Sequence, residues 1–209
     1  MRRPSPLVAF VLSAFGWIIV LTALWSQVSP WTSYPVGVLS HIALEQGAPI
    51  WVRKVQLTPG NMEVETSVAV PIAQAGGRMG EITIDASPGR YAYGLPILLA
   101  LLLAARSKGL WKKALAGYAL LLPAQAFSVS FYVLMQVVMT AQTNIRWLRV
   151  SQWQMEAIVY GYQVGALVLP TLVPIMLWLW LDRRFVEDVL VRGWRDAVAP
   201  VASGPGPSN

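Results

Sequence analysis

The sequence predicts an all-α membrane bundle of four transmembrane helices with a small extracytoplasmic antiparallel β-rich insert. Hydrophobic residues make up 56% of the 209 residues and the mean hydropathy is +0.52, which is more apolar than a soluble domain of this length usually is. The apolar residues form blocks that approach the roughly 20 residues needed to cross a bilayer. One segment between these blocks instead alternates apolar and polar residues, as a half-buried strand does.

Charge and the scarce residue types exclude several classes of function. The formal net charge is +6, but the basic residues cluster at the ends of the apolar blocks and form no zinc-finger or helix-turn-helix pattern. Nucleic-acid binding is therefore not expected. Cysteine is absent, which excludes disulfides, iron–sulfur clusters and thiol nucleophiles. We interpret the only histidine, His41, as a polar residue at an interface, and we expect no metal and no cofactor.

The first apolar block predicts a transmembrane helix within residues 1–29, preceded by a short cytoplasmic N-terminus. Residues 7–28 are almost wholly apolar and follow the basic pair Arg2 and Arg3. This run is too long for the hydrophobic core of a typical signal peptide, and no clear small-x-small cleavage pattern follows it. We therefore expect an uncleaved anchor.

Residues 30–90 predict an extracytoplasmic segment that contains an interfacial helix and β-hairpins. Apolar and small polar residues alternate over residues 30–47, which indicates either a helix lying along the membrane surface or a plain connector. The period then changes to two, with a Pro-Gly turn at residues 58–61 and a second turn at residues 74–78. A shorter strand at 81–85 would complete three antiparallel strands. So small a sheet needs support from the bilayer surface or from a partner.

Residues 91–184 predict three further transmembrane helices, and residues 185–209 predict a cytoplasmic tail with a disordered end. The first of the three blocks is about five residues short of a full span and is interrupted by Gly94 and Pro96. Such an interruption can mark a site, and a short span can also be accommodated by thinning of the bilayer. The three blocks are residues 91–105, 114–139 and 157–181.

The distribution of basic residues predicts that both termini lie in the cytoplasm. Cytoplasmic loops carry an excess of Lys and Arg, so the side with more bases is assigned to the cytoplasm. Ten of the 16 bases fall on the side of the termini, and six on the other side. The ten are Arg2, Arg3, Arg106, Lys108, Lys112, Lys113, Arg183, Arg184, Arg192 and Arg195, and the six are Arg53, Lys54, Arg78, Arg90, Arg146 and Arg149.

Two polar stripes on the third and fourth predicted spans form the candidate site. Their members recur every three or four residues, which places each set on one face of a helix. Polar side chains within lipid normally face protein, so the stripes are expected to face each other, to line a small polar cleft, to contact a partner, or to serve as helix-packing contacts. The members are Gln125, Ser128, Tyr132 and Gln136 on the third span and Glu156, Tyr160 and Gln163 on the fourth.

Small residues and prolines predict where the helices break or approach each other closely. Glycines spaced four residues apart let a neighbouring helix approach, and a proline inside a span bends it. We expect these positions to be architectural. They are Gly94, Pro96, Pro123, Gly161, Gly165, Pro170 and Pro174.

Two alternative functions remain open at this point. A membrane enzyme would use Glu156 as a base, with Tyr160 or Tyr132 as a proton donor, but this carboxylate has no His, Cys or second carboxylate beside it in the sequence. A small transport or lipid-handling subunit would use the polar face as a pathway. The sequence shows no evident inverted repeat and no ionisable residue in the middle of a span, which weakens a standalone transporter.

Four short motifs, in their order along the chain, carry a resemblance to a known family. They are YAYGLP at residues 91–96, LPAQA at 122–126, GYQVG at 161–165 and LPTLVP at 169–174, followed by Trp178 and the run Arg183-Arg184-Phe185. This pattern resembles the exosortase H-associated membrane proteins of Gram-negative bacteria. The resemblance covers residues 88–186 well and the preceding part only in layout.

The resemblance implies a link to an exosortase, the multispan transpeptidase thought to process proteins that carry a C-terminal sorting signal at the inner membrane. Exosortase-type chemistry uses a cysteine nucleophile, and this chain has no cysteine. We therefore expect a non-catalytic accessory protein of the bacterial inner membrane that docks beside the sorting transpeptidase, with its insert in the periplasm. The expected partners are membrane lipids and an exosortase-type multispan protein.

Overall fold

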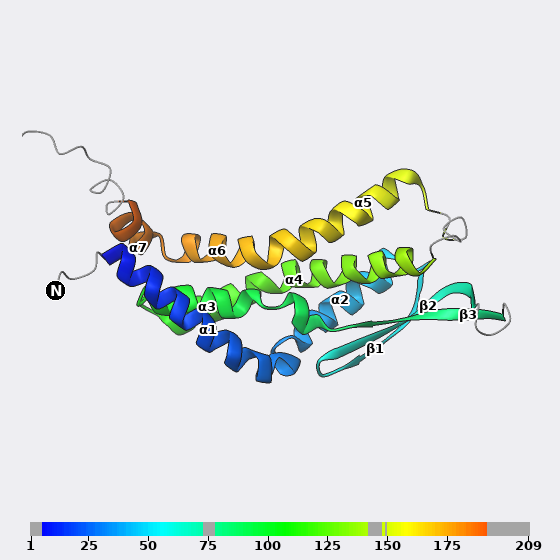
Figure 1. The fold of residues 1–209 in the computed structure, drawn as a ribbon, viewed down its shortest axis with the longest axis horizontal. Coiled ribbons are helices and arrows are strands. Elements are labelled where there is room, and N and C mark those ends of the chain that lie inside the picture. Colours follow the sequence, from blue (N-terminus) through cyan, green and yellow to red (C-terminus); the bar gives the residue numbers. More distant parts are fainter. Residues whose placement is uncertain (1–5, 73–77, 142–147, 149, 192–209) are drawn as a thin grey trace, which may run out of the picture.

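The computed structural model describes residues 6–72, 78–141, 148 and 150–191 of the 209-residue chain. Most of these residues are helical, and a three-stranded sheet lies between the second and third α-helices along the chain (Figure 1). The elements are α1 (Pro6–Thr32), α2 (Tyr34–Gly47), β1 (Val52–Thr58), β2 (Asn61–Ile72), β3 (Arg78–Ala86), η2 (Pro88–Tyr91), α3 (Gly94–Ala104), α4 (Leu110–Ala141), α5 (Gln152–Gln163), η4 (Val164–Val168), α6 (Leu169–Leu181), α7 (Arg183–Phe185) and η5 (Val186–Val191).

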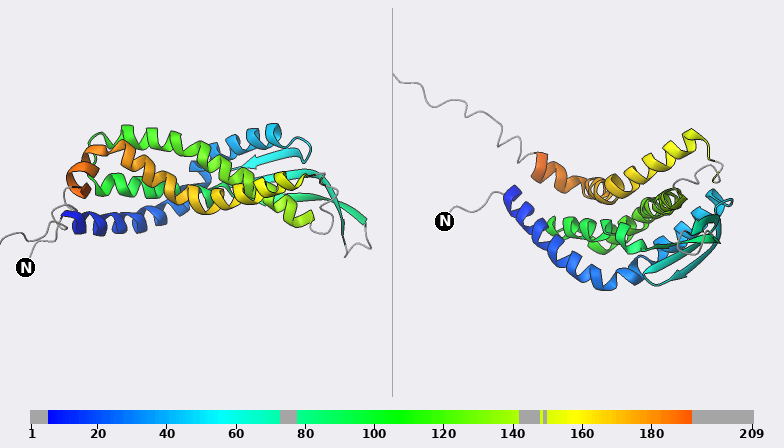
Figure 2. Two further views of the ribbon diagram at one scale, coloured as in Figure 1. Left: turned by 90° about the horizontal axis from the view of Figure 1, so that it is seen from above. Right: turned by 45° about the vertical axis from the view of Figure 1, so that its right-hand side comes forward.

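The elements form three layers along the long axis of the molecule (Figures 1 and 2). α3 and α4 make the middle layer. On one side, α6 packs against both of them, and α5 packs against α4. On the other side, α1 packs against α3, while α2 and strand β3 pack against α4. α4 thus runs through both halves of the molecule and joins them.

Three helices in the described part of the chain are long and apolar enough to cross a membrane. They are α1, α4 and the continuous helical segment from α5 to α6. The second predicted span, residues 91–105, is not confirmed, because its α-helix α3 has 11 residues. At about 1.5 Å per residue such a helix covers about 16 Å, roughly half of the hydrocarbon thickness. The chain before α3 forms the short helix η2, so Tyr91 lies outside the α-helix.

The predicted β-rich insert is confirmed as an antiparallel sheet with strand order β1-β2-β3. The turn between β1 and β2 contains Gly60, whose φ of +88° lies in the left-handed region that glycine adopts most easily. Met62, Val64 and Thr66 of β2 are buried, while the residues between them face the other side. The second predicted turn, at 74–78, falls largely on residues 73–77, which lie outside the described part of the chain.

The segment between α1 and the sheet is a helix, α2, and not a plain connector. Its inner face contributes Val36, Ser40 and Leu44 to the interior, where the Ser40 hydroxyl donates to the Val36 carbonyl. Outward-facing residues of α2 remain partly apolar, for example Ile42, which is 45% exposed. α2 therefore leaves an apolar outer surface beside α4.

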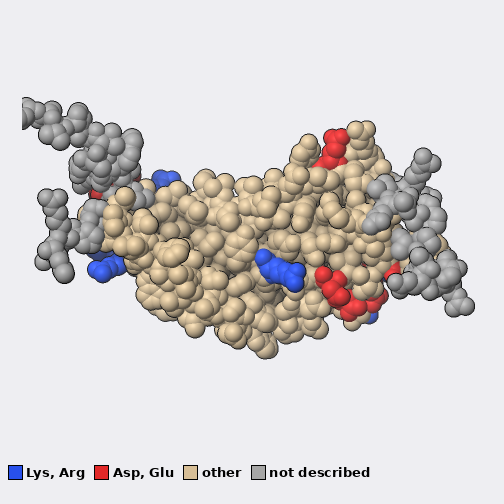
Figure 3. Space-filling view, viewed as in Figure 1, with Lys and Arg blue, Asp and Glu red and all other residues tan. Residues whose placement is uncertain are grey.

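Buried apolar side chains fall into two clusters at opposite ends of the molecule. One cluster joins α2, the sheet, the C-terminal half of α4 and α5, and includes Met62, Val133 and Ile158. The other joins α3, the N-terminal half of α4 and α6, and includes Leu98 and Trp178 with Phe10 of α1 packed against them. On the face seen in Figure 3, acidic residues lie towards the end with the sheet and α5, and a broad, mostly uncharged surface separates them from the opposite end.

The last long helical segment changes its hydrogen-bond pattern midway. Pro170 has no N–H to donate, and the N–H of Leu169 reaches back five residues to the carbonyl of Val164. This is the pattern of a π-helix, η4, which was not predicted from the sequence. Figure 1 shows the rod formed by α5 and α6 bent at this place. The bend directs α5 towards the sheet end.

Candidate functional site

The polar face of α4 lies in the interior of the molecule. Gln125 is 3% exposed, and its Nε2 donates to the carbonyl of Ala92 at 3.3 Å. Its Oε1 has no hydrogen-bond partner among the described residues. Ser128 is also buried, and its hydroxyl donates to the carbonyl of Ala124 within the same helix. Gln125 therefore joins α4 to the segment before α3, whereas the Ser128 hydroxyl bonds only within α4.

The next two members of this face lie closer to the sheet. The ring of Tyr132 packs between those of Tyr91 and Tyr162, with ring centroids 5.3 Å and 6.5 Å apart. Aromatic rings at these separations attract each other beyond simple burial. Gln136 is half-buried one turn further along α4. Tyr132 of α4 thus contacts aromatic rings from both η2 and α5.

The polar stripe of α5 faces outward, so the predicted polar cleft between two facing stripes is wrong. Glu156, Tyr160 and Gln163 are all exposed. Glu156 accepts a hydrogen bond from Gln152 Nε2 at 3.0 Å, which is a contact within α5. In the described part of the chain no hydrogen bond joins the two stripes. The exposed α5 stripe remains available for contact with a partner.

Close packing explains why α5 turns its other face towards α4. A Cβ on Gly161 would lie 2.2 Å from the ring of Phe131, and one on Gly165 would lie 3.0 Å from Cα of Ser128. Ile158 lies on the same face, three residues before Gly161, and is buried. Rotation of about 100° per residue puts Glu156, two residues before Ile158, on nearly the opposite side. The glycines, and not the polar residues, set the orientation of the helix.

The remaining helix-breaking positions lie near the crossing of α3 and α6. Gly94 opens α3, and a Cβ there would meet the carbonyl oxygen of Pro170 at 3.2 Å and Cγ of Pro174 at 3.5 Å. Pro96 follows in the first turn of α3, where its missing N–H has no helical acceptor to lose. Pro123 lies inside α4 and lines a groove described next. Gly94, Pro170 and Pro174 thus share one contact although they are far apart in the sequence.

An apolar groove runs along α4 between α2 and α5. It consists of two adjoining cavities of about 370 and 480 Å³, which share Gly47, Ala48, Phe131 and Leu134 as wall residues. The part near α5 is also lined by Trp153, which is 69% exposed. The walls are almost wholly apolar, so side chains of another helix would fit there better than a charged substrate.

One polar atom in this groove has no partner in the described residues. The Ser130 hydroxyl is buried and forms no hydrogen bond there. A buried hydroxyl without a partner is unfavourable. Sequence reasoning missed this groove, because its walls come from three separate elements. The exposed apolar positions of α2 and the aromatic start of α5 were the only available signals.

The described residues do not hold a group of three or more His, Cys, Asp and Glu side chains that could bind a metal ion. Glu156, the base in the enzyme hypothesis, lies on the surface with Gln152 as its hydrogen-bond partner. General acid–base catalysis needs a second functional group converging on the substrate. Of the two donors in that hypothesis, Tyr132 is on α4 among aromatic rings, whereas Tyr160 lies one turn after Glu156 on the same exposed face of α5.

Comparison with known proteins agrees with the four motifs found in the sequence. No curated protein and no solved structure matches the chain. The sequence model of one family, described as exosortase H-associated membrane protein, matches residues 4–185. This range includes every described helix and strand except η5. The chain therefore belongs to the family of exosortase H-associated membrane proteins.

Proposed function

We propose that this protein is a non-catalytic accessory subunit of an exosortase-type protein-sorting system. The observation that carries the proposal is the family match over residues 4–185, which links the chain to a membrane-embedded partner. The apolar groove beside α4 supports the proposal, because it is a surface suited to a helix and not to a polar substrate. The absence of cysteine from the sequence supports a role other than that of the transpeptidase itself.

The proposal includes a membrane placement with four crossings. α1, α4 and the segment from α5 to α6 cross as long helices, and α3 together with η2 makes the short fourth crossing. Local thinning of the bilayer and side chains that snorkel to the interface accommodate a short span. The basic turn between α3 and α4 then lies in the cytoplasm of a bacterial inner membrane, and the sheet and α5 lie in the periplasm.

The proposed occupant of the groove is one helix of the exosortase-type partner. Small side chains on the groove floor, such as Gly47 and Ala126, allow close approach of a helix backbone. The outward stripe of α5, with Glu156 and Gln163, faces away from the groove and is available for polar contacts with another part of the partner. The sheet, held beside this groove by α4, would help to position a substrate or product.

Copurification with the exosortase tests the docking proposal. Ala43→Trp and Ala157→Trp each fill the groove from an exposed position on its wall. Each is expected to reduce the amount of copurified exosortase about tenfold or more, as the loss of a central interface contact does. Ala116→Trp is the matched control, because Ala116 is an exposed alanine of α4 away from the groove. Unchanged copurification with both groove variants would refute docking through this surface.

Reporter fusions test the membrane placement independently. Fusions after Lys108 and after Arg184 are expected to report the cytoplasm, and fusions near Gly77 and Thr143 the periplasm. A cytoplasmic signal near Gly77 would show that the charge argument, and with it the placement of the sheet, is wrong.

A further inference from the structure

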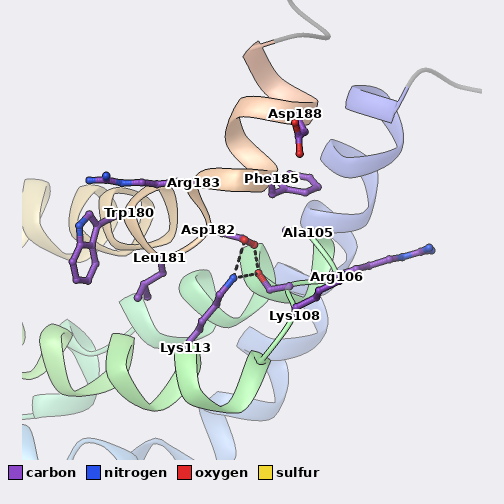
Figure 4. A pocket seen from close by; sticks show the side chains of 11 residues that line it. Ala105, Arg106, Lys108, Lys113, Trp180, Leu181, Asp182, Arg183, Phe185 and Asp188 are labelled. Carbon is purple, nitrogen blue, oxygen red and sulfur yellow. Dashed lines mark hydrogen bonds and ion pairs between the residues drawn. The ribbon is translucent and has the colours of Figure 1, made fainter.

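A second pocket lies at the end of the bundle opposite the sheet, and the accessory role does not use it. It has a volume of about 590 Å³ and is formed by the turn between α3 and α4 together with the junction of α6 and α7 (Figure 4). Its floor is an ion pair between Lys113 Nζ and Asp182 Oδ1, 2.8 Å apart. The Ser107 hydroxyl donates to the second oxygen of Asp182.

The charged residues that line this pocket favour an anion. Four are basic and two are acidic, and the internal ion pair neutralises one of each kind. Arg106, Lys108 and Arg183 remain, against Asp188. All three basic side chains are exposed, and none forms an ion pair with a described residue. Figure 4 shows the Arg106 and Arg183 side chains on opposite sides of the pocket, pointing away from each other.

A smaller cavity of about 260 Å³ adjoins the basic pocket. The two share Arg106 and Phe185 as wall residues. The rest of the smaller cavity is mainly apolar and is formed by α1 and the end of α3, with Ala9, Phe10 and Ala104 among its walls. α1 itself is a long apolar helix that buries little of its surface in the protein. A charged pocket thus adjoins a mainly apolar cavity against α1, which buries less of its surface in the protein than the other two long apolar helices.

We propose that the two cavities together bind an anionic phospholipid, with the phosphate headgroup at Arg106, which lines both cavities, and an acyl chain along α1 and Phe185. The required ligand is an anionic phosphate ester attached to an apolar chain, because one cavity offers cations and the other offers hydrocarbon. Basic pockets between transmembrane helices bind lipid headgroups in this manner. Arginine side chains can contact a phosphate with two parallel N–H groups. In a zwitterionic lipid the cation of the headgroup partly neutralises the charge of the phosphate, so these contacts favour an anionic lipid.

Native mass spectrometry of the full chain in a neutral detergent tests the proposal. The probes are phosphatidylglycerol, phosphatidylcholine with the same acyl chains, and inorganic phosphate. We expect phosphatidylglycerol to bind about tenfold or more tightly than phosphatidylcholine. Arg106→Gln and Arg183→Gln are each expected to weaken its binding about fivefold, since a basic residue near an anionic headgroup contributes about that factor. Phosphate that binds as tightly as phosphatidylglycerol would identify a free anion and overturn the lipid assignment.

Control variants separate this site from general surface charge. Lys112→Gln removes an exposed basic residue from the same end of α4 without touching either cavity, so its effect should stay below about twofold. Ala9→Trp fills the apolar cavity without changing charge and should weaken phosphatidylglycerol binding. Leu12→Trp, at a position 66% exposed on α1 outside that cavity, should not. Equal losses in Lys112→Gln and Arg106→Gln, or full binding by Ala9→Trp, would refute the site.

Discussion

The ion pair between Lys113 and Asp182 is expected to lock the basic turn to the end of α6. Asp182 is 7% exposed, and Lys113 Nζ lies 2.8 Å from its Oδ1 and 3.2 Å from Ser107 Oγ. At an effective dielectric constant of about 20, two charges 2.8 Å apart attract each other with about 6 kcal/mol before desolvation is subtracted. Removing one partner of a buried pair typically costs about 3–5 kcal/mol, because the other charge is left buried.

Lys113→Met should therefore lower the free energy of unfolding by about 2–3 kcal/mol. This loss is smaller than is usual for a broken buried ion pair, because the Ser107 hydroxyl still donates to Asp182. Asp182→Asn should cost about 1 kcal/mol, because the lysine side chain is 23% exposed and can reach water. The double variant should cost about 2 kcal/mol, less than the sum, since it buries no unpaired charge.

Unfolding in mixed micelles with increasing sodium dodecyl sulfate measures these three free energies, with tryptophan fluorescence as the signal. Trp178 and Trp180 lie on α6 within four residues of Asp182, and together with the other eight tryptophans of the sequence they report global unfolding. A cost below about 0.5 kcal/mol for Lys113→Met, or single costs that add within about 0.5 kcal/mol, would refute the lock.

Three further predictions concern the polar stripes and the groove. Gln125→Leu and Gln163→Leu should have additive effects on the free energy of unfolding, with Gln163→Leu close to neutral, because Gln125 is buried and Gln163 is exposed. A coupling energy above about 0.5 kcal/mol between the two substitutions would show that the side chains meet. Gly161→Ala should destabilise the bundle by about 1–3 kcal/mol, because the added methyl group would push the Phe131 ring towards the groove. The same shift should reduce exosortase copurification. Wild-type behaviour in both assays would contradict this packing. Glu156→Gln should leave sorting in cells nearly unchanged at normal protein level, whereas a loss of about a thousandfold would favour the enzyme hypothesis.

The main elements of the fold could be predicted because each has a strong local signal. Long apolar runs identify α1, α4 and the segment from α5 to α6, and a period of two with a Pro-Gly turn identifies the sheet. The short helix α3 was overestimated, because apolar composition continues through Tyr91 while the backbone there is already a separate 3₁₀ turn. Apolar runs report the affinity of a segment for lipid and say little about where its helix begins.

The relation between the two polar stripes could not be predicted from spacing alone. Spacing shows that residues share a face, but it does not show which of two faces meets the neighbouring helix. Both α4 and α5 carry a polar set and an apolar set, and the glycines of α5 decide the outcome because they allow Phe131 and Ser128 of α4 to come close. Gly161 and Gly165 were recognised as close-packing positions. Their consequence for Glu156 and Gln163 required the three-dimensional arrangement.

The central claim is that the groove along α4 receives a helix of an exosortase. Site-specific photocrosslinking in cells tests it most directly, with a photoreactive phenylalanine analogue placed at Trp153 and, as the matched control, at Trp111. Both side chains are well exposed, 69% and 84%, and they lie on opposite ends of the molecule, with only Trp153 lining the groove. We expect a covalent adduct with the exosortase from position 153 and none from position 111. Equal adducts from both positions, or an adduct from position 111 alone, would contradict it.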